Sequence, residues 1–121
     1  MAHSVIDQET LAILDDLFGN SQYLSELLPP FRDQIMSAQI GLDSAMSAQD
    51  ARGIIFHAHG LKSTSAQLGA LRVSGVCLLL ETLGASPAWD EIKSAVESLK
   101  AEAANAIYEL TTLENQRRVA S

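Results

Sequence analysis

The sequence has few of the residues that form disulfides, zinc sites or membrane spans. It contains one cysteine, Cys77, in 121 residues, so neither an internal disulfide nor a cysteine-based zinc site can form. A lone cysteine favours a reducing compartment, and we expect a cytoplasmic protein. No apolar run approaches the roughly 20 residues that a bilayer span requires. The N-terminus also lacks the basic and then apolar segments of a signal peptide.

Aromatic and basic residues are also scarce. Aromatics make up 5% of the chain, whereas hydrophobic residues, mostly Ala and Leu, make up 47%. This composition favours helices over strands. The formal net charge is −7 at pH 7, which repels nucleic-acid phosphates and argues against a function in DNA or RNA binding.

The apolar residues fall into successive stripes with helical spacing. The predicted helices run from Asp7 to Gly19-Asn20, over 24–45, over 50–68, over 70–83, and from Ser86 into the tail beyond Leu113. Because the connections are short, neighbouring helices should be antiparallel. We therefore predict an all-α fold: an up-down-up-down four-helix bundle with a short additional N-terminal helix. It should be a single domain over 1–121, with a core bundle of about 20–116.

Proline, glycine and serine suggest where these helices bend, end and begin. Pro29-Pro30 predicts a kink or a break, because proline removes a backbone donor and clashes with the preceding turn. Gly69 and Gly84 predict helix ends. Ser86 is a candidate cap for the last helix, with Pro87 at its first position.

The segment 58–70 contains the candidate functional residues. At about 100° per residue, Ala58, Leu61 and Leu68 face inwards, whereas His59 and Lys62 lie on an adjacent outer strip. Ile55, Ser63 and Ala66 surround them. Ile55 is either buried by the N-terminal helix or exposed as an apolar anchor for a partner.

These side chains fit phosphoryl chemistry. A neutral imidazole nitrogen is an available nucleophile near neutral pH, and the Lys62 ammonium, three residues on, could bind a phosphoryl group on His59. Folding the chain back near Gly69 places Glu81 opposite His59. There its carboxylate could hold one ring nitrogen and leave the other free to attack.

The segment resembles the histidine phosphotransfer (HPt) motif A-H-x-L-K-G-S-x-x-x-L-G-A. The matching residues are Ala58, His59, Leu61, Lys62, Leu68, Gly69 and Ala70. The resemblance extends to the opening Asp-x-x-Thr-Leu pattern, the Phe31 region, residues 48–50, and Cys77 with Leu80-Glu81. Ser63 departs from the family's usual glycine and Thr64 from a common serine, which could alter the choice of partner.

The resemblance implies a phosphorelay carrier. His59 would take a phosphoryl group from a receiver-domain aspartate and pass it to a response regulator, with Lys62 stabilising the phosphoryl group and Glu81 orienting the imidazole. Ile55, Ser63 and Ala66 would contact the partner. The expected partners are receiver domains and a hybrid sensor histidine kinase. The carrier should bind no ATP and hold no cofactor or metal, because the magnesium lies in the receiver. We expect a monomer, because a single bundle can satisfy its own apolar stripes.

Two alternatives stay open at this point. A helical bundle could bind a receiver or kinase without carrying phosphate, and replacing His59 would separate the two cases. A metal protein or enzyme is a more remote alternative. Di-metal bundles need Glu-x-x-His motifs, which this sequence lacks. His57 lies two residues from His59 and so on another face, where we expect a structural role.

Overall fold

The computed structural model describes residues 5–19 and 22–120, with side chains as far as Arg117. Its five helices are α1 (Gln8–Phe18), α2 (Tyr23–Ala48), α3 (Ala51–Gln67), α4 (Leu71–Ala85) and α5 (Trp89–Ala120). The residues described include no strand, which confirms the predicted all-α class. No helix in these ranges is both long and apolar enough to cross a membrane.

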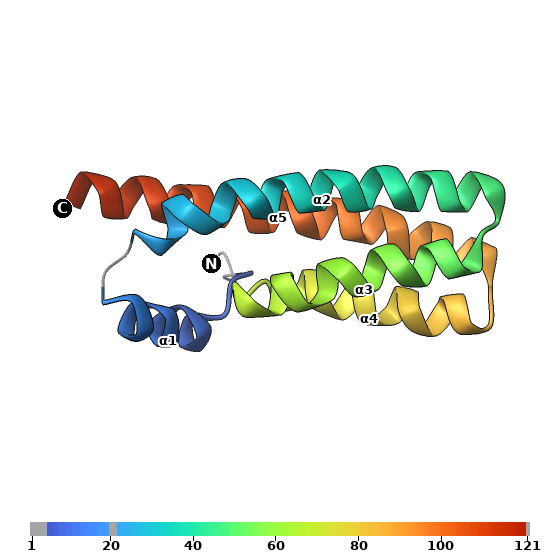
Figure 1. Cartoon of the computed structure of the whole chain (residues 1–121), viewed down its shortest axis with the longest axis horizontal. Helices are drawn as coiled ribbons and strands as arrows, with labels where there is room; N and C mark the ends of the chain where they lie inside the picture. The colour runs from blue at the N-terminus through green and yellow to red at the C-terminus, as the bar shows by residue number, and fades with distance from the viewer. Residues whose placement is uncertain (1–4, 20–21, 121) are drawn as a thin grey trace.

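Four of the helices form an antiparallel bundle (Figure 1). α3 packs against α2 and α4, and α5 packs against the other sides of α2 and α4. The residues of the predicted apolar stripes meet in the centre, where the fully buried large side chains include Phe31, Leu42, Ile54, Leu61, Leu80, Ile92, Leu99 and Leu110. Burying a side chain of this size stabilises the fold by about 1.5–3 kcal/mol, so this centre supplies most of the driving force.

Several predicted helix boundaries are confirmed by local geometry. The Asp7 carboxylate accepts a hydrogen bond from the backbone N–H of Thr10, and the Asp50 carboxylate accepts one from that of Gly53. Both aspartates therefore cap helix starts. Gly19 and Gly69 follow helix ends at φ of 70° and 80°, in the left-handed region that favours glycine. Asn20, expected at the same end as Gly19, lies outside the described residues.

Of the kink or break expected at Pro29-Pro30, the break is wrong, because α2 runs through both prolines; the kink stays a prediction. The two rings lie on an exposed face of the helix. The carbonyls that would have accepted from their missing N–H groups belong to Ser25 and Glu26, which are also exposed. Water can therefore satisfy these carbonyls, which lowers the cost of proline in the helix.

The boundary expected between the last two helices is also wrong. Gly84 does not end α4 but lies buried inside it. A Cβ at Gly84 would lie 2.6 Å from Cγ1 of Ile55, so this glycine allows α3 and α4 to pack closely. Ser86 then follows the end of α4 as its C-cap. For this reason α5 begins at Trp89 and not at Pro87.

The N-terminal helix is attached at both of its ends. The backbone N–H of Asp7 donates to the carbonyl of Gly69 at 2.8 Å, in the turn between α3 and α4. At the other end of α1, the Arg117 guanidinium of α5 donates to both carboxylate oxygens of Asp15, at 2.6 and 3.2 Å, and to the hydroxyl of Tyr23 at 3.1 Å. α1 thus lies outside the bundle, beside the end where α3 turns into α4 (Figure 1).

Candidate functional site

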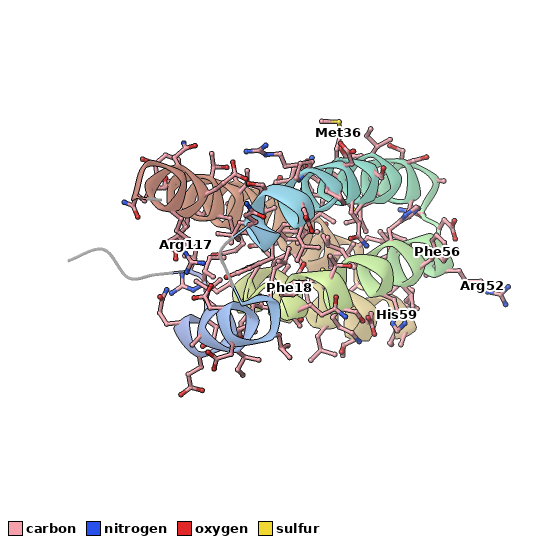
Figure 2. All side chains as sticks on the ribbon, turned by 60° about the vertical axis from the view of Figure 1, so that its left-hand side comes forward. Phe18, Met36, Arg52, Phe56, His59 and Arg117 are labelled. Carbon is pink, nitrogen blue, oxygen red and sulfur yellow. The ribbon has the colours of Figure 1, made fainter. Side chains whose placement is uncertain are left out.

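His59 lies on the outer face of α3, with 69% of its side chain exposed. Ala58 and Leu61 lie one helical turn apart on the inner face of α3, and both are buried. Because these two residues face the core, the adjacent His59 must lie on the outer face. A Cβ at the next residue, Gly60, would meet nothing within 4 Å. Figure 2 shows the imidazole projecting from the bundle. A partner as large as a protein can therefore reach the ring.

Glu81 of α4 lies beside the ring. Its Oε1 is 3.2 Å from Nδ1 of His59. An ionised carboxylate has no proton to donate, so this contact is a hydrogen bond when Nδ1 carries the hydrogen. In the neutral ring the lone pair is then on Nε2. The proximity predicted by folding the chain back near Gly69 is present in the structure.

Lys62 completes a group of three side chains. Its Nζ lies 2.9 Å from Oε1 of Glu81 and 3.0 Å from Oε2. These two side chains are partly buried, with exposed fractions of 27% for Lys62 and 19% for Glu81. The hydrogen bond from Lys62, and secondarily that from His59, lowers the pKa of the Glu81 carboxyl, so the carboxylate is ionised at neutral pH. Lys62 thus binds the carboxylate that contacts His59.

The three residues expected to contact a partner differ in how exposed they are. Ser63 and Ala66 are exposed, and their small side chains leave the backbone of α3 accessible. Ile55 is half-buried. Part of its side chain packs against Gly84 of α4, and it also lines an open groove beside His59, so its contact with a partner stays a prediction.

Two residues near His59 had no place in the sequence-based prediction. Phe56, three residues before His59, is 72% exposed. Its position on the same helical strip could have been recognised from the spacing alone. Gln34 of α2 donates from Nε2 to the carbonyl oxygen of Gly60 at 2.7 Å. This contact joins residues far apart in the chain, and no local pattern indicates it.

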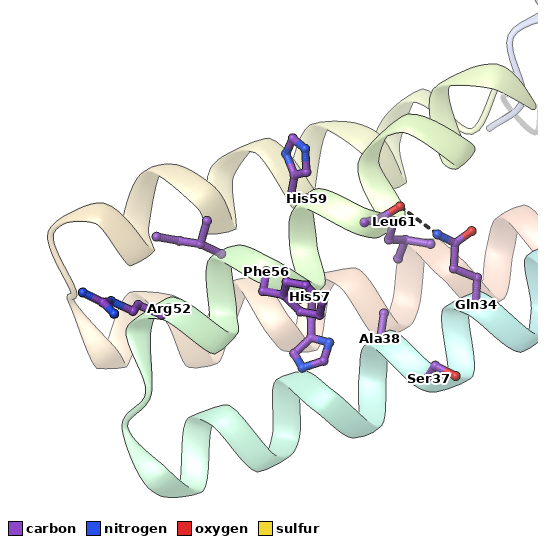
Figure 3. A pocket seen from close by; sticks show the side chains of 10 residues that line it. Gln34, Ser37, Ala38, Arg52, Phe56, His57, His59 and Leu61 are labelled. Atoms are coloured by element: carbon purple, nitrogen blue, oxygen red, sulfur yellow. Dashed lines mark hydrogen bonds between the residues drawn. The ribbon is translucent and has the colours of Figure 1, made fainter.

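His57 has the structural position expected of it, and Cys77 lies in the core. Figure 3 shows that His57 and His59 project from different faces of α3. The His57 ring lies over Gly41 of α2, where an added Cβ would come within 2.5 Å of it. Cys77 is fully buried, and burial, with a smaller contribution from Glu81, raises the pKa of its thiol to about 12. Within the ranges described, no three His, Cys, Asp or Glu side chains are grouped as metal ligands would be.

A helical bundle that presents an exposed histidine, held by a carboxylate on the next helix, offers an oriented imidazole nucleophile to another molecule. The Hpt domain family model matches residues 22–111. Because this match covers most of the chain, the chain belongs to the Hpt domain family. Its role is histidine phosphotransfer within a phosphorelay.

Solved structures with the same fold support the architecture. Histidine-containing phosphotransfer protein B (HptB) from Pseudomonas aeruginosa PAO1 superposes with a TM-score of 0.85 at 23% sequence identity, covering 95% of this chain and 98% of that chain. A protein from rice, assigned as a histidine-containing phosphotransfer protein, gives a TM-score of 0.81 at 16% identity, covering 98% of this chain and 87% of that chain. A comparison with curated protein sequences gave no match.

Proposed function

We propose that His59 is the phosphoryl acceptor and that its Nε2 is the reacting atom. The observation that carries this proposal is the contact between Nδ1 of His59 and Oε1 of Glu81 at 3.2 Å. This contact leaves the second nitrogen on the side of the ring that faces solvent. His57, the other histidine among the described residues, packs against Gly41 and is less accessible to a donor.

The transfer step follows from this geometry. The Nε2 lone pair attacks the phosphorus of an aspartyl phosphate on a receiver domain, and the bond between phosphorus and the aspartate oxygen breaks. The aspartate leaves as a carboxylate, and the ring, which keeps its hydrogen on Nδ1, becomes a cation. Glu81 stabilises that cation, because its carboxylate is already in place and needs no reorganisation. The reverse sequence delivers the phosphoryl group to the next receiver.

Lys62 has two functions in this proposal. In the unphosphorylated site its ammonium binds Glu81 and keeps the carboxylate ionised and oriented. Once His59 carries a phosphoryl group, the ammonium lies one helical turn away and is a charge-assisted donor for the phosphoryl oxygens. Lys62 therefore supports both states of the carrier.

The chain would be a stoichiometric carrier that binds neither ATP nor a cofactor of its own. Magnesium would be held by the receiver, where carboxylates provide the oxygen ligands that this ion prefers. The proposed partners are a hybrid sensor histidine kinase and a response regulator, and the proposed compartment is the cytoplasm. We propose that the carrier acts as a monomer, because the bundle buries its own apolar stripes.

The test is intact-mass analysis after incubation with a small phosphoramidate and, in parallel, with a receiver domain phosphorylated by acetyl phosphate. The parent chain should gain one acid-labile phosphoryl group. The His59→Ala variant should gain none, and the matched control His57→Gln should be labelled as the parent is. Equal labelling of the parent and of His59→Ala would transfer the assignment to His57. Labelling of the parent by neither donor would contradict the carrier function.

A further inference from the structure

A line of side chains along the outside of α3 continues beyond the three residues of the site. Arg52, Phe56, His59 and Ser63 are spaced by four, three and four residues, so they lie on one face of the helix, and all four are exposed. We call these four residues the outer stripe of α3. Figure 2 shows Arg52, Phe56 and His59 projecting from the same part of the bundle.

Phe56 is held in place although it is exposed. Its ring packs edge-on against that of His57, with centroids 5.1 Å apart and planes at 82°. The His57 ring lies in turn on Gly41 of α2, which has no side chain to displace it. An exposed aromatic ring that is oriented in advance loses little entropy on binding, and such rings are common anchors of protein interfaces.

An open groove between α2 and α3 runs from Phe56 to His59 (Figure 3). Its volume is about 630 Å³ and its surface is mainly apolar. Gln34 lines the wall on α2 and is fixed to the backbone of α3 by its hydrogen bond to the Gly60 carbonyl oxygen. The groove therefore ends beside the histidine and offers apolar surface to whatever contacts the ring.

Arg52 adds a positive charge to this surface. The chain has 15 acidic and 8 basic residues, and Lys62, Arg72, Lys100 and Arg117 all form ion pairs. The described residues provide no such partner for Arg52, although carboxylates are abundant. An unpaired guanidinium close to a phosphoryl acceptor is suited to an anionic partner.

We propose that Phe56 and Arg52 determine which receiver domain docks on this carrier, with Phe56 as its apolar anchor and Arg52 as its electrostatic contact. This inference rests on the proposed function, which requires a receiver aspartate to reach His59. A receiver that brings its aspartyl phosphate to Nε2 must cover the surface next to the ring, and the groove with Phe56 is continuous with it. The carboxylates that would hold magnesium in the receiver are opposite in charge to Arg52. Ser63 and Ala66 allow close approach on the other side of His59.

The test is the kinetics of transfer from phosphorylated receiver domains encoded in the same genome, using the receiver that labels the parent chain fastest. Phe56→Ala should raise KM at least about tenfold, as truncation of an interface anchor does, with a much smaller change in kcat. Arg52→Gln should raise KM by about threefold and make it less sensitive to salt. Two matched controls outside the stripe, the exposed aromatic Tyr108→Ala and Lys93→Gln, both on α5, should transfer as the parent does.

The proposal is overturned if Phe56→Ala keeps a KM within about twofold of the parent, or if Tyr108→Ala raises KM as much as Phe56→Ala does. Circular dichroism checks that each variant is folded. Phe56→Leu, which keeps an apolar side chain, should fall between the parent and Phe56→Ala. Failure of the proposed function is a separate outcome, in which neither phosphoramidate nor any receiver labels the parent chain.

Discussion

Removing the charge of Glu81 while keeping its shape tests how the site activates His59. The Glu81→Gln variant retains an oxygen that can accept the hydrogen on Nδ1, but it cannot stabilise the positive charge that forms on the ring. Glu81→Ala removes both interactions. The two variants therefore separate the effect of the charge from the effect of holding the ring in one tautomer.

The size of the charge effect follows from the distance between the two groups. Unit charges 3.2 Å apart interact by about 1.3 kcal/mol in a dielectric of about 80, the appropriate limit because 69% of the His59 side chain is exposed. The Lys62 ammonium at 2.9 Å neutralises part of this interaction. About 1 kcal/mol remains, and Glu81→Gln should slow phosphorylation about fivefold.

The assay is the rate of labelling by phosphoramidate at neutral pH, followed by intact mass. Glu81→Ala should be slower than Glu81→Gln, because its ring carries the hydrogen on Nε2 for part of the time. Glu102→Gln is the matched control, since Glu102 pairs with Arg72 away from the site and has a similar exposure of 23%. Rates for both Glu81 variants within about twofold of the parent would refute the reasoning.

Three further predictions concern stability and reactivity. The pKa of the Glu81 carboxyl is lower in the folded chain than its ordinary value of 4.5. The pairing of Glu81 with Lys62 therefore stabilises the fold fully above pH 4.5, and this stabilisation is lost as the pH falls through the lowered pKa of the folded state. In urea titrations Glu81→Gln should therefore cost about 1 kcal/mol near pH 7 and nothing near pH 2, and an equal cost at both would contradict the assignment. Gly84→Ala should lower the melting temperature, because the clash with Ile55 should cost about 1–2 kcal/mol of stability. Gly75→Ala, whose Cβ meets open space, should instead raise the melting temperature, because alanine in a helix should add about 1 kcal/mol of stability. Equal shifts in the two variants would rule out the packing explanation. Cys77, with its thiol pKa raised to about 12 by burial, should react with iodoacetamide only as fast as the chain unfolds, and prompt labelling of the native chain would contradict this.

Most of the fold could be predicted because its signals are local. Apolar spacing gave all five helices, and Asp7 and Asp50 marked two helix starts by capping. The errors came from residues whose effect depends on the surroundings. A glycine at position 84 is typical of a helix end, yet here its lack of a side chain makes room for Ile55 of α3. Two consecutive prolines are typical of a helix break, yet α2 continues through Pro29-Pro30. Both prolines lie on an exposed face, where water can replace the lost hydrogen bonds.

The candidate site divides in the same way. His59 and Lys62 could be predicted as neighbours because they lie one turn apart on a single helix. Glu81 could be placed because a short turn joins its helix to α3. Gln34 could not, since its contact with Gly60 depends on how α2 packs against α3. The contact of Ile55 with α4 could not be predicted for a related reason, since it depends on a glycine on the neighbouring helix.

The short turn between α3 and α4 has a consequence for folding. His59 and Glu81 are only 22 positions apart in the chain, so the reacting ring and its carboxylate are brought together as soon as one helical hairpin closes. Contacts at such short separation cost little loop entropy and form early. The chemistry should therefore depend on a small, early-forming part of the molecule. In hydrogen exchange we expect α3 and α4 to remain protected around the site while α1 opens, since α1 is attached by a few contacts at its two ends.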